Sequence, residues 1–320
     1  HDCLEYKIIL CCNYLITVCV FQCFVAYAMS INPVLEGFVD SFLGGEAFMG
    51  RAEGRMYGIG CALDVAGLRF STILVTIVFL LMNDYAHIKK YIPLYLVAFL
   101  IITIIGNMMA RSTTIGVGLS LAFFLLGGIY TQSMKVDREM LWKWVGGMLV
   151  VFVPIVVYLY NTNPAFHENL RFGFEGFFSL WEKGKWEVSS NDILLDHMIR
   201  FPETLETWII GDGYAANPKD DPNYIGHIWH GFYMGTDIGY LRFIFYFGLI
   251  GTLAIIIFIC YAAWVCMKRF PNYRMMFFMI LLVNLIGWFK VSSDVFLTFA
   301  LFLCLSQEEQ EISDRKLILQ

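Results

Sequence analysis

Long apolar runs are the feature that most limits how this chain can fold. Six clear runs lie at 8–29, 63–82, 92–110, 113–130, 144–160 and 238–265. A helix needs about 20 apolar residues to cross the roughly 30 Å of hydrocarbon in a bilayer. The chain is 58% hydrophobic and only 15% charged, with a mean hydropathy of +0.64, which is too little charge to coat a soluble domain. We therefore predict a polytopic membrane protein.

The apolar stretch 275–306 is too long for one ordinary span. A polar group interrupts it near the middle, namely Lys290, Ser292, Ser293 and Asp294. We expect two short helices that turn at 290–294, which brings the predicted total to about eight transmembrane helices. A membrane barrel would show short alternating segments instead, so the prediction is an all-α fold.

Basic residues in the short loops predict an orientation, because cytoplasmic loops carry an excess of Lys and Arg. These residues concentrate in 83–91, 131–143 and 266–274. The three loops fall on one side if the spans alternate, so we expect that side, together with both termini, to be cytoplasmic. The large loop 161–236 then lies on the outer side. It separates the predicted helices of 1–160 from the C-terminal helices and cytoplasmic tail of 237–320.

The large loop 161–236 has 76 residues, eleven of them acidic and five basic. Its many aromatic residues and its helical periodicity argue against disorder. One apolar stripe is formed by Leu170, Phe174, Phe177, Phe178 and Trp181. We expect this helix to lie in the membrane surface or to roof the bundle. A second helix is expected from about Ser190 to Arg200, and a third from Pro202 to Gly211.

Several common catalytic and binding motifs are missing from the sequence. It contains no HExxH, no Walker loop and no GxSxG, and Asp220 and Asp221 are adjacent rather than spaced as in a calcium loop. We therefore predict no cofactor and no metal. The net charge of −5 and the pI near 5.7 argue against a nucleic-acid partner, which needs a basic face.

Arginines gather on the predicted outer side of the membrane. They are Arg51, Arg55, Arg69, Arg111, Arg171, Arg200 and Arg242. An arginine at the centre of a span costs about 2.5–3.5 kcal/mol on insertion scales, so it usually has a partner or a ligand. Each one alone could extend to lipid headgroups or pair with Asp64 or Asp237. Together they favour an anionic ligand such as a diphosphate, since guanidinium groups bind phosphate bidentately and stay charged.

The stretch HIWHGFYMGTDIGYLR, residues 227–242, adds groups that can transfer protons. His227 and His230 are spaced to share a helical face, and histidine near its ordinary pKa can accept a proton from an attacking hydroxyl. Hydrogen bonding within the loop is the alternative role for either histidine. Asp237 could instead cap the helix that starts at 238, and Asp64 could cap the helix at 63–82.

Two segments near the C-terminus resemble the closing region of bacterial O-antigen and capsular polysaccharide polymerases. They are RFPETLETWIIGDGY (200–214) and TDIGYLRFIFYFGLIG (236–251), in which a G-x-G turn precedes a T-D-x-G-Y segment that opens a span. EGRMYGIGCALDVAGLRFS (53–71) and GNMMARSTTIGV (106–117) resemble the arginine-bearing segments that precede the large periplasmic loop of that family. The likeness covers most of the chain, and the TDIGY region is its most specific part.

The resemblance implies a metal-independent glycosyltransferase of the bacterial inner membrane. It would join, on the periplasmic side, oligosaccharide repeat units carried on undecaprenyl diphosphate. His230 and Asp237 fall where the related O-antigen ligases keep a catalytic histidine, so we expect both to be catalytic. Arg55, Arg111 and Arg242 fall in arginine-bearing segments of the family. With Arg200 from the outer set, they are the expected diphosphate-binding residues.

Two alternatives stay open at the level of sequence. The O-antigen ligases typically have His-Asn where this chain has His230 and Gly231, which favours a polymerase over a ligase. A transporter or flippase for lipid-linked sugars would need charges deep within several spans and paired half-repeats, and is the weaker alternative. Members of the family have more than eight spans, so we expect further spans before residue 1. The expected partners are the bilayer, the lipid-linked oligosaccharide and a chain-length regulator protein.

Overall fold

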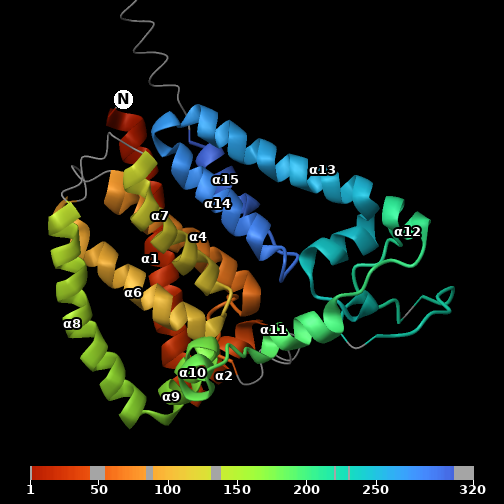
Figure 1. The fold of residues 1–320 in the computed structure, drawn as a ribbon, viewed down its shortest axis with the longest axis horizontal. Coiled ribbons are helices and arrows are strands. Elements are labelled where there is room, and N and C mark those ends of the chain that lie inside the picture. Colours follow the sequence, from red (N-terminus) through yellow and green to blue (C-terminus); the bar gives the residue numbers. More distant parts are fainter. Residues whose placement is uncertain are drawn as a thin grey trace, which may run out of the picture.

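The structure, a computed structural model, describes residues 2–43, 55–83, 89–130, 138–219, 221–229 and 231–305. Within these ranges every regular element is a helix, and the only β-type pairs are the isolated bridges Gly58–Cys61 and Ala216–Phe232. The predicted all-α fold is confirmed for this part of the chain. Figure 1 shows the long helices side by side, with α2, α9, α10 and α11 gathered at one end of the bundle.

Six long helices occupy the six clear apolar runs. They are α1 (Asp2–Ile31), α4 (Leu63–Asn83), α6 (Ile92–Met109), α7 (Thr113–Tyr130), α8 (Arg138–Thr162) and α13 (Gly239–Arg269). Five apolar segments among the described residues are long enough to cross a membrane: Leu4–Ile31, Leu63–Asn83, Ile92–Met109, Met140–Thr162 and Gly239–Arg269. The described part of the chain is therefore all-α with five candidate spans, as expected for a membrane-embedded protein. The total of about eight transmembrane helices stays a prediction.

The C-terminal apolar stretch is divided as expected. It forms α14 (Arg274–Gly287) and α15 (Phe296–Leu303), and the break between them runs over 288–295, wider than the predicted turn. Hydrogen bonds within the chain hold the break. Trp288 donates its Nε1 proton to the Ser293 carbonyl at 2.8 Å, and Val295 donates its backbone N–H to Asn284 Oδ1 at 2.8 Å. The break thus has a fixed shape at the end of the bundle near α4.

Helix α4 lies at the centre of the bundle, and nearly all of its residues from Ala66 to Met82 are buried. It packs against α6, α7 and α14. Ser71 ties α4 to α7, because its hydroxyl donates to the Ser112 carbonyl and accepts from the Gly116 N–H, both at 3.0 Å. This contact fixes the turn between α6 and α7 against the start of α4.

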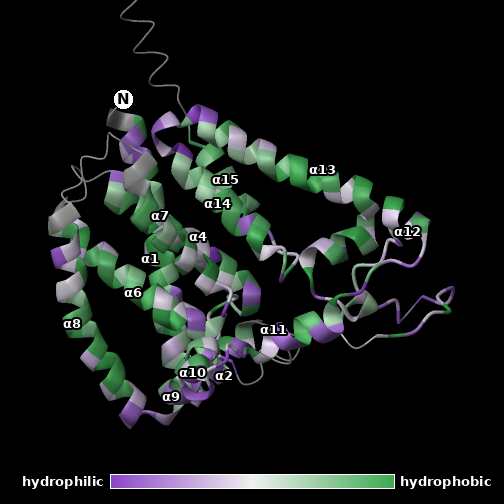
Figure 2. Cartoon of the chain, in the orientation of Figure 1, coloured by the Kyte–Doolittle hydropathy of each residue, from purple (hydrophilic) through white to green (hydrophobic). Residues whose placement is uncertain are grey.

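Most of the shorter helices lie at one end of the bundle or in the large loop, and the turns Lys89–Tyr91 and Pro271–Tyr273 lie in the connections between long helices. The shorter helices are α2 (Pro33–Leu43), α9 (Pro164–Gly173), α10 (Glu175–Lys183), α11 (Ser189–Ile193), a π turn (Leu194–Met198), α12 (Leu205–Ile210) and the 3-10 turns Lys89–Tyr91, Tyr233–Gly235 and Pro271–Tyr273. Figure 2 shows hydrophobic residues along most of α13 and hydrophilic ones around α9 and α10. The large loop is therefore helical in its first half, as predicted.

The single apolar stripe predicted for the start of this loop is wrong beyond Phe174. The helix breaks there between α9 and α10, and although Leu170 is buried, Trp181 is 90% exposed. A Cβ on Gly173 would lie 2.8 Å from the Asn107 carbonyl carbon, so the end of α9 is pressed against the end of α6. The periodicity of the sequence carries no information about this tertiary contact.

The third predicted helix is shorter than expected. Its N-cap is Thr204, whose hydroxyl accepts from the Thr207 N–H, so the helix begins at Leu205 rather than at Pro202, and it ends at Gly211 as predicted. Its end packs on α13 where Gly248 has a φ of 66° and interrupts the helical backbone. Glycine adopts this conformation without the steric cost of a Cβ. Helix α13 therefore consists of two helical parts with α12 against the joint.

Candidate functional site

A charged cavity of about 180 Å³ lies at the end of the bundle where α9, α10 and α11 gather. Its charged and polar lining comes from segments far apart in the sequence: Arg55, Asp64, Arg111, Ser190, Asp237 and Lys290. Two predicted diphosphate-binding residues and one predicted catalytic residue therefore meet in one space. Apolar side chains of α11 and the following π turn, Ile193, Leu194 and Met198, complete the wall.

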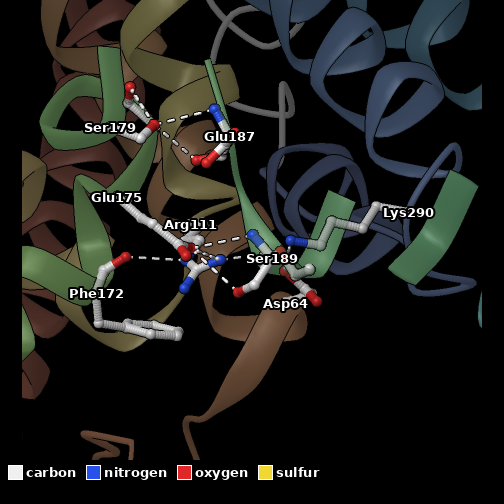
Figure 3. Close-up of polar contacts among 10 residues, drawn as sticks. Asp64, Arg111, Phe172, Glu175, Ser179, Glu187, Ser189 and Lys290 are labelled. Carbon is white, nitrogen blue, oxygen red and sulfur yellow. Dashed lines mark hydrogen bonds and ion pairs between the residues drawn. The ribbon is translucent and has the colours of Figure 1, made fainter. Parts of the chain in front are cut away.

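Arg111 is the most firmly held cation of the cavity (Figure 3). It lies in the turn between α6 and α7, and its side chain is only 11% exposed. Its guanidinium donates to the Phe172 carbonyl at 2.9 Å and to Ser190 Oγ at 3.2 Å, and forms an ion pair with Glu175 at 2.6 Å. Burial lowers the pKa of Arg111 from its ordinary value, and the Glu175 carboxylate opposes that shift. The side chain is therefore preorganised and charged.

Arg55 reaches the same aromatic ring as Arg111. The guanidinium carbons of Arg55 and Arg111 lie 5.1 and 4.0 Å from the centre of the Phe172 ring. The segment that carries Arg55 is anchored to α2, because the Tyr57 hydroxyl donates to Glu36 at 2.9 Å. Two positive groups near one ring repel each other, and the charge of Arg55 also lowers the pKa of Arg111. An anion between them would relieve this repulsion.

Asp64 and Lys290 form an ion pair across the cavity, with 3.4 Å between Oδ1 and Nζ. Asp64 lies inside the first turn of α4, which begins at Leu63, so it does not occupy the N-cap position suggested by the sequence. Lys290 comes from the break between α14 and α15. The sequence alone predicts for Lys290 only a place in the turn that interrupts an apolar stretch. A charged residue in such a stretch was nevertheless the signal for a functional position.

Asp237 lines the cavity just before α13 begins, and its carboxylate contacts Arg242 at 3.4 Å. The predicted capping role is wrong, because Ile238 is the N-cap residue of α13 and no side chain caps the helix. Burial raises the pKa of Asp237 to about 6, while the positive charge of Arg242 opposes the shift. A carboxylate with that pKa is suited to accept a proton near neutral pH.

Arg242 supports Asp237 without itself lining the cavity. Its guanidinium lies 3.7 Å from the centre of the Phe232 ring and contacts the Ala215 carbonyl at 3.5 Å. Its side chain is 19% exposed. The structure thus places Arg242 behind Asp237, and its predicted role in binding diphosphate stays a prediction.

The other residues singled out from the sequence lie apart from the cavity or outside the described residues. Arg200 stacks on Trp229, with 4.1 Å from the guanidinium carbon to the ring centre, and does not line the cavity. His227 is exposed and lies in a non-helical segment, so the helical face predicted for it is wrong. His230 and Arg51 lie outside the described residues, and the catalytic assignment of His230 stays a prediction.

A second, larger hollow of about 500 Å³ shares Arg111 and Phe172 with the charged cavity, and we call it the outer cleft. Carboxylates dominate its lining: Glu175, Glu182, Glu187 and Asp192. Three of them pair with cations: Glu175 with Arg111 at 2.6 Å, Glu182 with Arg171 through two contacts of 2.8 Å, and Glu187 with Lys183 at 2.6 Å. Ser179 holds the wall together by accepting from the Glu187 N–H at 3.0 Å (Figure 3). Such a lining offers many hydrogen-bond acceptors to a polar ligand.

Comparisons with known proteins add no relative to this picture. No family model matches the chain, and no match was found among curated proteins or solved structures.

Proposed function

We propose that this protein is a polysaccharide polymerase of the bacterial inner membrane. It joins oligosaccharide repeat units carried on undecaprenyl diphosphate, on the periplasmic side of that membrane, where the large loop 161–236 lies. The observation that carries the proposal is the meeting of Arg55, Arg111 and Asp237 in one cavity. Two cations and a carboxylate with a raised pKa are the groups that glycosyl transfer from a diphosphate requires.

The position of the cavity suits a lipid-borne diphosphate. It lies where the candidate spans α4 and α13 begin and α6 ends, which is the level of a lipid headgroup if these helices cross the bilayer. A diphosphate held there leaves its polyprenyl tail in the hydrocarbon layer. Arg111 and Arg55 bind the phosphate oxygens and stabilise the negative charge that develops on the leaving group.

The proposed reaction is a displacement at an anomeric carbon. A hydroxyl of one repeat unit attacks the anomeric carbon of the glycan on the second lipid. The bond between that carbon and the diphosphate oxygen breaks, and undecaprenyl diphosphate leaves with the electron pair. Asp237 accepts the proton of the attacking hydroxyl, because its raised pKa suits a base near neutral pH. His230 is the second candidate for this role.

The outer cleft is the proposed binding place for the glycan. It adjoins the charged cavity through Arg111 and Phe172, so a sugar in the cleft would place its diphosphate beside the arginines. Glu182, Glu187 and Asp192 can accept hydrogen bonds from sugar hydroxyls. The outer cleft and the charged cavity then hold the two chemically different parts of one substrate.

The test is to follow polymer formation in cells that make the polysaccharide. We expect Arg111→Ala and Asp237→Asn each to replace the ladder of long glycans on a gel with single repeat units, and Arg242→Ala to shorten the ladder. Lys185→Ala is a matched control, since Lys185 is an exposed cation of the same loop and lines neither hollow. Unchanged ladders in all three variants would contradict the proposal. Long chains that stay on undecaprenyl diphosphate would indicate a ligase instead.

A further inference from the structure

We infer that Lys290 is an additional cation of the diphosphate site, which contacts Asp64 in the charged cavity and exchanges this partner for a phosphate oxygen when the ligand binds. This inference rests on the proposed function, because it assigns a further residue to the same anion site. It concerns a residue that the sequence marked only as an interruption of the apolar stretch 275–306.

Lys290 lies opposite Arg111 in the cavity wall (Figure 3). Its side chain is 24% exposed and that of Asp64 is 18% exposed, so the pair is largely withdrawn from solvent. The distance of 3.4 Å between Nζ and Oδ1 is longer than the roughly 2.7–2.9 Å of a strong charge-assisted hydrogen bond. Lys290 is therefore close to Asp64 without being tightly bound to it.

The fold around Lys290 is held by other contacts. The Trp288 carbonyl accepts from the Tyr240 N–H at 3.1 Å, which joins the break to the start of α13. The hydrogen bonds from Trp288 to Ser293 and from Val295 to Asn284 close the break itself. Since these contacts involve backbone and buried side chains, the ammonium group is not needed to give the break its shape.

The charges of the cavity favour exchange of partners. In this structure Lys290 pairs with Asp64, and Arg111 pairs with Glu175. A bound diphosphate carries more than one negative charge close to both cations, so it competes with both carboxylates. Asp64 then competes with the ligand for Lys290. Lys290 therefore strengthens anion binding, and Asp64 weakens it.

The experiment measures binding of inorganic pyrophosphate to the purified full chain in detergent by calorimetry, at neutral pH and low salt. We expect Lys290→Gln to weaken binding about tenfold, the effect of losing one hydrogen bond between charged groups. We expect Asp64→Asn to tighten binding several-fold, because it frees the ammonium. Lys268→Gln is the control: Lys268 stacks on Trp264 at the far end of α13 and should leave the affinity unchanged.

Each outcome decides the inference. If Lys290→Gln binds pyrophosphate like the parent while Arg111→Ala does not, the role of Lys290 is overturned and the proposed function stands. If Lys290→Gln and Asp64→Asn weaken binding together and lower the melting temperature together, the pair is only structural and the inference is also overturned. If the parent chain binds no pyrophosphate, the diphosphate site itself is contradicted. Should Lys290→Gln fail to fold, the expected gain in Asp64→Asn tests the inference alone.

Discussion

Two regions of the molecule place an arginine about 4 Å from the centre of an aromatic ring, and one of them lines the charged cavity. In the charged cavity, Arg111 lies 4.0 Å from the Phe172 ring. In the segment 200–242, Arg200 lies 4.1 Å from Trp229 and Arg242 lies 3.7 Å from Phe232. The local contacts are nearly the same in both regions. They cannot by themselves identify a binding site.

The difference lies in what else surrounds each guanidinium. Arg111 also has the Phe172 carbonyl, Ser190 and Glu175 as partners, and its neighbours in the cavity come from the starts or ends of several helices. Among the described residues, Arg200 adds to its ring contact one of 3.4 Å to the carbonyl of His197, three residues earlier in the chain. Convergence of distant segments, rather than a dense local group of charges, marks the better candidate site. The predictions below test this distinction.

The largest expected effect is that of Arg111→Ala. It removes the buried guanidinium that we propose to stabilise the leaving diphosphate, so the polymerisation rate should fall at least about 100-fold. The measurement uses purified protein and lipid-linked repeat units. Arg111→Lys keeps the charge but loses the planar fork, and it should recover only part of the rate. A rate for Arg111→Ala within a factor of two of the parent would remove the charged cavity as the site.

Asp237→Asn is expected to lower the rate about 100-fold and to remove a pH dependence. Because burial raises the pKa of Asp237 to about 6, its basic form is lost as the pH falls through that value. The rate of the parent should therefore drop about tenfold per pH unit below the pKa and level off above it. The variant should show no such step. A step of the same size in Asp237→Asn would assign the proton transfer to another group, with His230 the first candidate.

Arg242→Ala should have an intermediate effect. Arg242 belongs to the segment 200–242, and it contacts Asp237, which lines the charged cavity. Its positive charge opposes the burial that raises the pKa of Asp237, so its removal should move the acidic step of the rate to higher pH. At a pH just above 6 the rate should fall about tenfold, and it should recover as the pH is raised, because Asp237 then ionises. Arg242→Lys should restore most of the original profile. A loss that no pH reverses would instead indicate direct contact between Arg242 and the ligand.

Much of the fold follows from the sequence because membrane spans are long and continuous. The apolar runs locate α1, α4, α6, α7, α8 and α13, and the polar residues around Lys290 locate the break between α14 and α15. The stripe from Leu170 to Trp181 predicts one continuous helix, because the helical periodicity continues through Phe174. The chain instead turns at that residue. At that turn Gly173 approaches Asn107 of α6 closely, and the spacing of residues in the sequence carries no information about this tertiary contact.

The site was predicted in part, and the reason is similar. Arg55, Arg111 and Asp237 were selected from the sequence by residue type and by resemblance, and they lie in one cavity. The sequence predicts Asp64 as a helix cap and Lys290 as a turn residue. Their ion pair is not predictable in this way, because it joins α4 to the break between α14 and α15, which are far apart in the sequence. The sequence around Asp64 and the sequence around Lys290 contain no signal that predicts this ion pair. The tertiary contact between α4 and α14 is what brings the two residues to the same wall.

The smallest expected effect is that of Arg200→Ala, which tests the other side of the comparison. An exposed cation–π contact such as that with Trp229 contributes about 0.5–1 kcal/mol, so its loss should lower the free energy of unfolding by no more than that. The polymerisation rate should stay within about threefold of the parent, since Arg200 does not line the cavity. Trp229→Ala is the matched variant, because it removes the same contact and keeps the charge. If Arg200→Ala lost activity tenfold while Trp229→Ala did not, the charge of Arg200 would act on the ligand directly, and the segment 200–242 would belong to the site.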